Sequence, residues 1–267
     1  GAHDRFQGSH ARAGVLLYLM TQFWQADIET GDGVMPTFIA HPGDHQARPL
    51  VIIYMDALGI RQELRDMARR MAAGGYYVML PNLFYRAGGI SFDPSGLPDT
   101  IDPEMERLNV ETTMSMVAFD TAGAMAHAER DPLADPRRVG VIGYCMGGRH
   151  ALTAAATFPG QVTAAASIHG GRLVSDSHDS AHLRLRQVKA EAYFAFADQD
   201  VAAPAEHLKR IRTEMHAHDV RGSAELHEGA VHGFAFPERY CYHPAVAERV
   251  WNHWFAMLQR NIGDATP

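Results

Sequence analysis

The chain has 267 residues, of which 46% are hydrophobic and 21% are charged, a balance that excludes a disordered or fibrous protein. Its net charge of −7 comes from 24 Lys and Arg against 31 Asp and Glu, without a basic stripe, so no nucleic-acid partner is expected. Two cysteines are too few for a disulfide framework, and no Cys or His spacing matches a structural zinc site.

The first twenty residues predict an N-terminal extension (1–20) that precedes the folded domain. Its polar start, Gly1–Gly8, is expected to form a loose tail. The apolar run Gly14–Met20 is far shorter than the ~18 residues that a membrane helix needs, and it lacks the basic region and cleavage site of a signal peptide. We therefore expect a cytoplasmic protein without a membrane partner.

Short apolar runs alternate with segments of helical periodicity along the rest of the chain. The stretch Asp27–Ala40, with Gly31-Asp-Gly33 at its turn, predicts an antiparallel hairpin at a sheet edge. Five further runs predict buried strands, namely Pro49–Asp56, Tyr76–Leu80, Arg138–Tyr144, Val162–Ile168 and Ala192–Ala197. Five segments predict helices, namely Arg61–Ala73, Val110–Glu129, Met146–Thr157, Ala205–His216 and His243–Leu258. This order predicts an α/β fold in one domain (21–262), with a mostly parallel sheet and helices on both faces.

One stretch, Arg86–Pro103, interrupts the alternation. It is rich in Gly, Pro and Asp and is longer than a simple connection between two elements. Long loops of this kind often cover a binding site. We expect an excursion near residues 86–109 to act as a partial lid.

One cysteine lies where an α/β protein can present a nucleophile. The sequence Gly143-Tyr-Cys145-Met-Gly147-Gly falls between a predicted strand and a predicted helix. Glycine two residues before and after Cys145 permits a tight turn in which a Cβ would collide with neighbouring backbone. The turn places the thiol at a helix N-terminus, which favours a thiolate and a developing oxyanion. The alternative interpretation is a buried structural cysteine on a glycine-rich turn.

An acid and a histidine follow later predicted strands. Asp198 and Asp200 both come just past Ala192–Ala197, where an orienting acid belongs, and each could equally be an ordinary turn residue. His232 lies in a loop next to Gly233, from which a base can reach a nucleophile, although most of the 16 histidines are expected to have no such role. The order cysteine, acid, histidine is the order of α/β-hydrolase triads.

Three motifs together resemble the dienelactone hydrolase family of α/β-hydrolases. The turn around Cys145 matches the family's G-x-C-x-G-G pattern, Asp200-Val-Ala-Ala-Pro204 is similar to D-x-x-V-P, and His232-Gly-Phe234 matches H-G-F. The resemblance runs from about Asp27 to Leu258.

This resemblance settles the choice of acid. The four-residue spacing between acid and proline selects Asp200 and leaves Asp198 as a turn residue. The implied catalytic triad is Cys145, His232 and Asp200, and the remaining cysteine, Cys241, is interpreted as structural.

The resemblance also implies an accessory carboxylate and an oxyanion hole. The family has an acid after an early strand, in a Q-E-x-x-G pattern, that hydrogen-bonds the resting thiol. In Met55-Asp56-Ala57-Leu-Gly59 that place is taken by Asp56, which is one methylene shorter than Glu. The implied N–H donors of the oxyanion hole belong to Ala57 and Met146.

The predicted substrate pocket departs from the family at one position. The namesake enzymes place an Arg two residues after H-G-F to bind the lactone's carboxylate, and here that residue is Phe236. A second family Arg follows a P-x-L-x-x-R stretch, which Pro81-Asn-Leu-Phe-Tyr-Arg86 resembles. The pocket is therefore predicted to contain Arg86, Tyr144, Phe234 and Phe236. Loss of half of an anion clamp predicts weak binding of a small carboxylated lactone.

Two other arginines, Arg172 and Arg239, are expected to be solvated surface residues. The histidines His41 and His45, with Asp44, do not have a convincing ligand spacing, so no metal and no cofactor are expected.

The combined prediction is a hydrolase that cleaves a small-molecule ester or lactone through a cysteine thioester. One alternative is a thioesterase or acyltransferase that uses the same triad. Another is a catalytically silent α/β-hydrolase that binds a ligand. The sequence does not predict the oligomeric state.

Overall fold

The computed structural model describes residues 14–96 and 101–263. The expected loose tail, Gly1–Gly8, lies outside these residues, and residues 14–20 are helical. Among the described residues, no helix combines the length and the apolarity that a membrane crossing requires.

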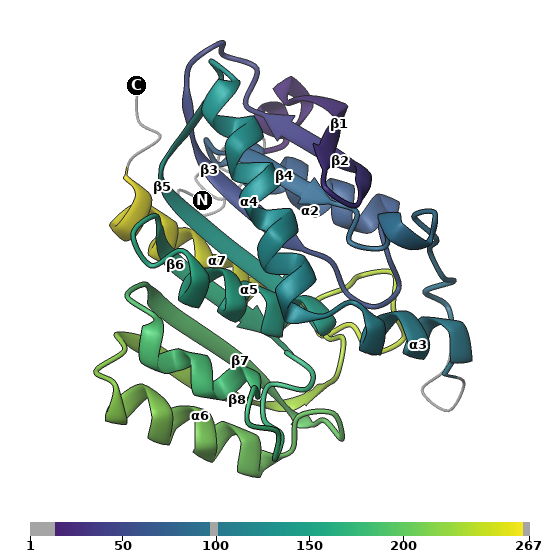
Figure 1. Cartoon of the computed structure of the whole chain (residues 1–267), viewed down its shortest axis with the longest axis vertical. Coiled ribbons are helices and arrows are strands. Elements are labelled where there is room, and N and C mark those ends of the chain that lie inside the picture. The colour runs from purple at the N-terminus through teal and green to yellow at the C-terminus, as the bar shows by residue number, and fades with distance from the viewer. Residues whose placement is uncertain (1–13, 97–100, 264–267) are drawn as a thin grey trace, which may run out of the picture.

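A single eight-stranded sheet forms the centre of the molecule (Figure 1), in the order β1-β2-β4-β3-β5-β6-β7-β8. The strands are β1 (Gln22–Thr30), β2 (Gly33–His41), β3 (Arg48–Tyr54), β4 (Tyr77–Pro81), β5 (Ala134–Tyr144), β6 (Val162–Ile168), β7 (Glu191–Gln199) and β8 (Gly222–Val231). The hairpin β1–β2 is antiparallel and joins the sheet through β4, whereas β4, β3, β5, β6, β7 and β8 pair in parallel. The predicted edge hairpin and the mostly parallel sheet are confirmed.

Helices cover both faces of the sheet. They are α2 (Gln62–Ala73), α3 (Pro103–Glu111), α4 (Met114–Arg130), α5 (Met146–Thr157), α6 (Ala205–Ala217) and α7 (Pro244–Ile262), with 3₁₀ turns η1 (Tyr85–Ala87) and η2 (Ala181–Gln187). In Figure 1, α4, α5 and α6 lie in front of the sheet, and α2 and α7 lie behind it. Helices shield both faces of the central strand β3, which is buried from Leu50 to Tyr54. Burial on both faces suits its apolar sequence.

The structure divides one predicted helix into two. Where Val110–Glu129 was expected as a single helix, α3 ends at Glu111 and α4 begins at Met114. The hydroxyl of Thr113 accepts a hydrogen bond from the N–H of Met116 and so caps α4. Upstream, Asp102 caps α3 with Pro103 at its first position, so residues 103–109 at the end of the 86–109 excursion are helical.

The parallel strands end together at one edge of the sheet. Tyr54 pairs with Gly143, Tyr144 pairs with Ile168, and Ile168 pairs with Ala195. Residues that follow β3, β5, β6, β7 and β8 therefore meet at this edge, beside α3 (Figure 1).

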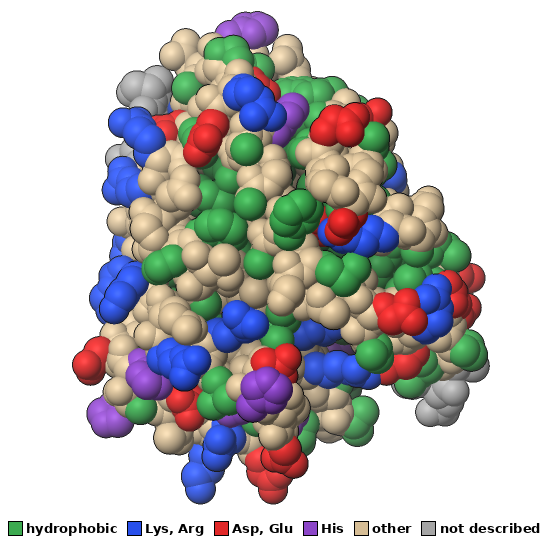
Figure 2. All heavy atoms as spheres, viewed as in Figure 1, with side chains coloured by type: hydrophobic (Ala, Val, Ile, Leu, Met, Phe, Trp, Pro, Cys, Tyr) green, Lys and Arg blue, Asp and Glu red, His purple; other side chains and the backbone are tan. Residues whose placement is uncertain are grey.

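On the face in Figure 2, basic side chains are interspersed with acidic and apolar ones.

Candidate active site

Cys145 lies on a sharp turn between β5 and α5, as the sequence predicts. Its backbone has φ of 52° and ψ of −114°, a strained conformation for a residue with a side chain. The flanking glycines make this turn possible. A Cβ on Gly143 would lie 1.8 Å from the carbonyl oxygen of Gly147, and a Cβ on Gly147 would lie 2.1 Å from that of Tyr54.

The three predicted triad residues lie in hydrogen-bond contact. Nε2 of His232, which follows β8, lies 2.9 Å from Sγ of Cys145. Nδ1 of the same ring lies 2.7 Å from Oδ2 of Asp200, which follows β7. The other carboxylate oxygen of Asp200 accepts the N–H of Ala202, so the acid is held on both sides. Asp198 instead accepts the N–H of Gly229, away from the ring.

The surroundings of Cys145 favour its thiolate. Burial raises the pKa of this thiol, but the charge and the hydrogen bond of His232 outweigh burial and bring the pKa below its ordinary value. The nearby charge of Asp56 acts upward on the same pKa, and the N–H of Met146, which donates to the sulfur, acts downward. A lowered thiol pKa is typical of a reactive cysteine.

His232 is shifted in the opposite direction. Burial disfavours its charged form, but the thiolate of Cys145 and the carboxylate of Asp200 together hold its pKa well above the usual range. The pair can therefore rest as thiolate and imidazolium.

The two residues expected to form the oxyanion hole line the cavity beside the thiol. Ala57 follows β3 and Met146 is the first residue of α5, and both line the same cavity as Cys145. Donors from these two positions suit a tetrahedral oxyanion.

The accessory acid Asp56 is engaged by an arginine that the sequence analysis did not identify. Its carboxylate accepts a hydrogen bond of 2.6 Å from Arg61, whose guanidinium also donates to Glu238 at 2.5 Å. Both Asp56 and Arg61 are buried. No hydrogen bond between Asp56 and Cys145 is found in the described part of the chain. Arg61 is the residue before α2, and its partner Glu238 lies 177 positions away, so no local pattern indicates the contact.

A cavity of about 840 Å³ opens above the thiol. The triad and Asp56 line its base, and Phe92, Met105 and Asn109 from the 86–109 excursion line its side. This volume is large enough for a drug-sized organic molecule.

The four residues predicted for the pocket lie in different places. Phe236 lines the cavity. Tyr144 and Phe234 are buried and do not line it; both contact the ring of His169. The prediction that places Arg86 in the pocket is wrong for this structure. Arg86 does not line the cavity.

The reason is a buried acid on α4. Both terminal nitrogens of Arg86 donate to the carboxylate of Asp120 on α4, at 2.8 and 2.9 Å, and its Nε donates to Asp32. The guanidinium of Arg86 therefore has two carboxylate partners, and these ion pairs hold segments of the protein together rather than binding a substrate. The short-range P-x-L-x-x-R pattern does not reveal that α4 supplies a competing acid.

Three other arginines line the cavity instead, including two that were expected to be surface residues. Arg172 and Arg239 lie in its wall, and Arg149 on α5 is buried there. Arg149 follows Cys145 by four positions, so helical periodicity places it one turn from the nucleophile and could have identified it. His169, the residue directly after β6, was missed although it stands at the same sheet edge as the triad.

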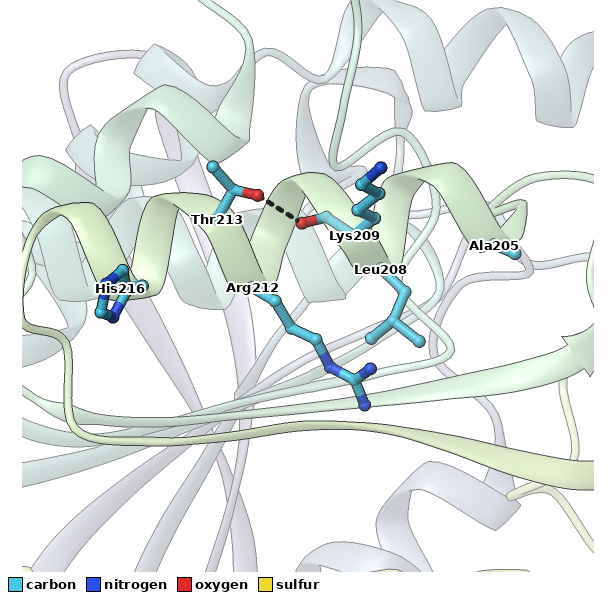
Figure 3. Close-up of a pocket in the computed structure, with 6 residues that line it drawn as sticks. All are labelled: Ala205, Leu208, Lys209, Arg212, Thr213 and His216. Atoms are coloured by element: carbon cyan, nitrogen blue, oxygen red, sulfur yellow. Dashed lines mark hydrogen bonds between the residues drawn. The ribbon is translucent and has the colours of Figure 1, made fainter.

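A second depression runs along one side of α6 (Figure 3). All six of its lining residues, from Ala205 to His216, belong to that helix. The hydroxyl of Thr213 bonds the carbonyl of Lys209, and Arg212 reaches the carbonyl of Ala224 on the edge strand β8. These polar groups stabilise the helix and the sheet edge rather than converging on a ligand. Among the described residues, no cluster of His, Cys, Asp and Glu could hold a metal ion.

The chain is similar to several known proteins. The model of the dienelactone hydrolase family matches residues 35–262. A Salmonella typhi protein, named provisionally as a carboxymethylenebutenolidase, is 29% identical over 230 residues, which cover 83% of this chain and 82% of the relative. A Synechocystis protein with the same provisional name is 25% identical, over 84% of this chain and 91% of its own.

Solved structures show the same fold. A provisional dienelactone hydrolase from Klebsiella pneumoniae has a TM-score of 0.78 at 24% identity, over 88% of this chain and 98% of its own. The dienelactone hydrolase-like promiscuous phosphotriesterase P91, from metagenomic libraries, has a TM-score of 0.76 at 19% identity, over 91% and 99% of the two chains.

Proposed function

The chain belongs to the dienelactone hydrolase family and is an ester or lactone hydrolase, and from this premise we propose that it works through a cysteine acyl-enzyme. Cys145 is the nucleophile, His232 the general base and acid, and Asp200 the residue that orients the imidazole. The observation that carries the proposal is the continuous contact from Sγ through the imidazole to the carboxylate, at 2.9 and 2.7 Å.

The first half of the reaction forms a thioester. The thiolate of Cys145 attacks the substrate carbonyl carbon, and the N–H groups of Ala57 and Met146 stabilise the oxyanion that develops. The C–O bond to the alcohol then breaks, and His232 as imidazolium gives its proton to the departing oxygen. In a lactone the alcohol remains attached to the acyl group.

The second half regenerates the enzyme. Neutral His232 removes a proton from water, which attacks the thioester carbonyl in the same oxyanion hole. Cys145 then leaves as a thiolate, and the imidazolium remains beside it. Esters and lactones suit this chemistry because an alkoxide, once protonated, leaves readily, whereas an amine is expelled less easily than the thiolate.

Release of p-nitrophenol from p-nitrophenyl acetate tests the mechanism. We expect the Cys145→Ala variant to lose activity by at least about 10³-fold, while Cys241→Ala, which removes the other cysteine, retains it. Intact-protein mass spectrometry during turnover should show an acetyl adduct on Cys145. Equal rates for the wild type and Cys145→Ala would favour a catalytically silent protein, and an adduct on Cys241 would relocate the nucleophile.

A further inference from the structure

The charged side chains in the cavity wall are largely occupied by other protein groups. Asp56 is bonded to Arg61, Asp200 to His232, and Glu106 to Arg172. Asp102 accepts the first N–H groups of α3. Asp93, the fifth acid of the wall, accepts hydrogen bonds from the N–H and the hydroxyl of Ser95. A substrate would have to compete with these partners to engage any of the five acids. The pairing therefore withdraws the buried acids Asp56 and Asp200 from substrate recognition.

The buried arginine of the wall is also occupied. Arg149 is 7% exposed and donates to both the backbone and the side-chain oxygen of Asn109, at 2.6 and 2.9 Å. Asn109 lies in the last turn of α3, where carbonyl groups lack helical partners and a positive charge is favourable. Arg149 thus fastens the C-terminal end of α3 to α5 and shapes the cavity.

Three side chains with apolar surface are exposed at the mouth of the cavity. Val201, directly after Asp200, is 99% exposed, Ile101 before α3 is 63% exposed, and Tyr240 before α7 is 50% exposed. They come from three separate segments and line the same cavity. Inside the cavity, Phe236 and Met105 continue the apolar surface towards the thiol. Apolar groups that gather at a concave site usually mark what the site binds.

We propose that the substrate is an uncharged ester or lactone with an extended apolar group that lies against Val201, Ile101 and Tyr240. This inference rests on the proposed function and adds the substrate class to it. Phe236, two residues after H-G-F, lines the same cavity and brings no charge to it, which is consistent with an uncharged substrate.

A series of p-nitrophenyl esters from acetate to decanoate tests the substrate class. Each methylene that leaves water on binding contributes a factor of about two to three, so kcat/KM should rise by about 10²-fold between acetate and octanoate. A p-nitrophenyl ester of the same length that ends in a carboxylate should react more slowly than octanoate.

Substitutions at the mouth of the cavity test whether Val201 and Ile101 cause the rise of kcat/KM with chain length. Val201→Ser combined with Ile101→Ser should lower the octanoate-to-acetate ratio of kcat/KM by about tenfold. Val34→Ser, which alters an exposed apolar side chain on β2, is the matched control and should leave the ratio unchanged. If the octanoate-to-acetate ratio is the same in the double variant and in the wild type, Val201 and Ile101 do not contact the apolar group of the substrate.

The outcomes separate this inference from the proposed mechanism. A kcat/KM that stays flat or falls with chain length, in an enzyme that still depends on Cys145, would overturn the substrate class alone. A faster reaction of the carboxylate-terminated ester would also overturn it. That result would assign recognition to Arg239, whose Nε has no hydrogen-bond partner among the described residues. Loss of the dependence on Cys145 would instead overturn the mechanism.

Discussion

The ring of His169 packs against the ring of His232, with 5.2 Å between their centroids and an angle of 63° between their planes. His169 is fully buried, has φ of 38°, and neither of its ring nitrogens has a hydrogen-bond partner among the described residues. It does not line the cavity, so it can act on substrate only through its neighbour. Burial and the charge of His232 hold its pKa well below the usual range, so this ring stays neutral.

The first prediction is that His169 positions the base. His169→Ala removes the ring that limits rotation of His232, and kcat/KM should fall by about 10- to 100-fold. His169→Phe keeps a ring of similar shape and should retain most of the activity. The dependence of the Cys145 alkylation rate on pH should be weaker in the alanine variant than in the wild type. In the phenylalanine variant it should return to that of the wild type. Wild-type kinetics in His169→Ala would exclude a positioning role.

The second prediction concerns the pH dependence of the thiol. Because the Cys145 pKa lies below its ordinary value of about 9, the thiolate should persist at lower pH than in an ordinary cysteine. The rate of alkylation by iodoacetamide should therefore rise with pH through an inflection below that value. His232→Gln removes the imidazolium charge that lowers the pKa, so burial and the charge of Asp56 should outweigh the N–H of Met146 and move the inflection upward. An unchanged inflection would mean that the imidazole does not stabilise the thiolate.

The third prediction separates two roles of Asp56. Its negative charge raises the pKa of Cys145, so Asp56→Asn should move the alkylation inflection to lower pH. Arg61→Met should instead destabilise the protein by about 3–5 kcal/mol, because the buried carboxylate then lacks its partner. Urea unfolding measures the second effect. If Asp56→Asn moves the inflection upward, the acid activates the thiol, as the resemblance to the family implies.

Sequence reasoning identified the residues whose position depends on short motifs at strand ends. Cys145, Asp200 and His232 each follow a strand, and parallel strands bring their carboxyl ends to one edge whatever the loops do. The limits of α5 and β6 also follow directly from the sequence.

Contacts between distant segments were the part that local patterns could not predict. Glu238, one partner of Arg61, and Asp120, the partner of Arg86, lie far away in the sequence, so these contacts depend on how distant segments pack. Arg172 is exposed, as expected, and it also forms an ion pair with Glu106 on α3. Such contacts between elements are a tertiary property, and periodicity does not encode them.

The fourth prediction follows from the position of Arg86. Asp120 is only 1% exposed, so Arg86→Met should leave a buried, unpaired carboxylate and lower the free energy of unfolding by about 3 kcal/mol. The kcat/KM of the folded variant should stay near that of the wild type, because Arg86 does not line the cavity. Arg137→Met breaks an exposed pair with Asp135 and, as the control, should cost less than about 1 kcal/mol. A large rise in KM for Arg86→Met, with stability unchanged, would return Arg86 to the substrate pocket.

The fifth prediction tests the turn that presents the nucleophile. Gly147 lies where α5 passes closest to β3, and an added Cβ would lie 2.1 Å from the carbonyl oxygen of Tyr54. Because backbone on both sides would have to move, Gly147→Ala should destabilise the protein by more than about 3 kcal/mol or prevent folding. Gly160→Ala is the matched control, since an added Cβ there meets no atom within 4 Å, and its effect should stay within about 0.5 kcal/mol.

Activity separates a local effect on this turn from general unfolding. If Gly147→Ala folds at low temperature, α5 must move away from the sheet and carry the N–H of Met146 with it. The oxyanion hole would then lose one donor, and kcat should fall by about 10²- to 10³-fold while circular dichroism stays native. A Gly147→Ala variant with wild-type stability and wild-type kcat would show that the close approach of helix and strand is not what places Cys145.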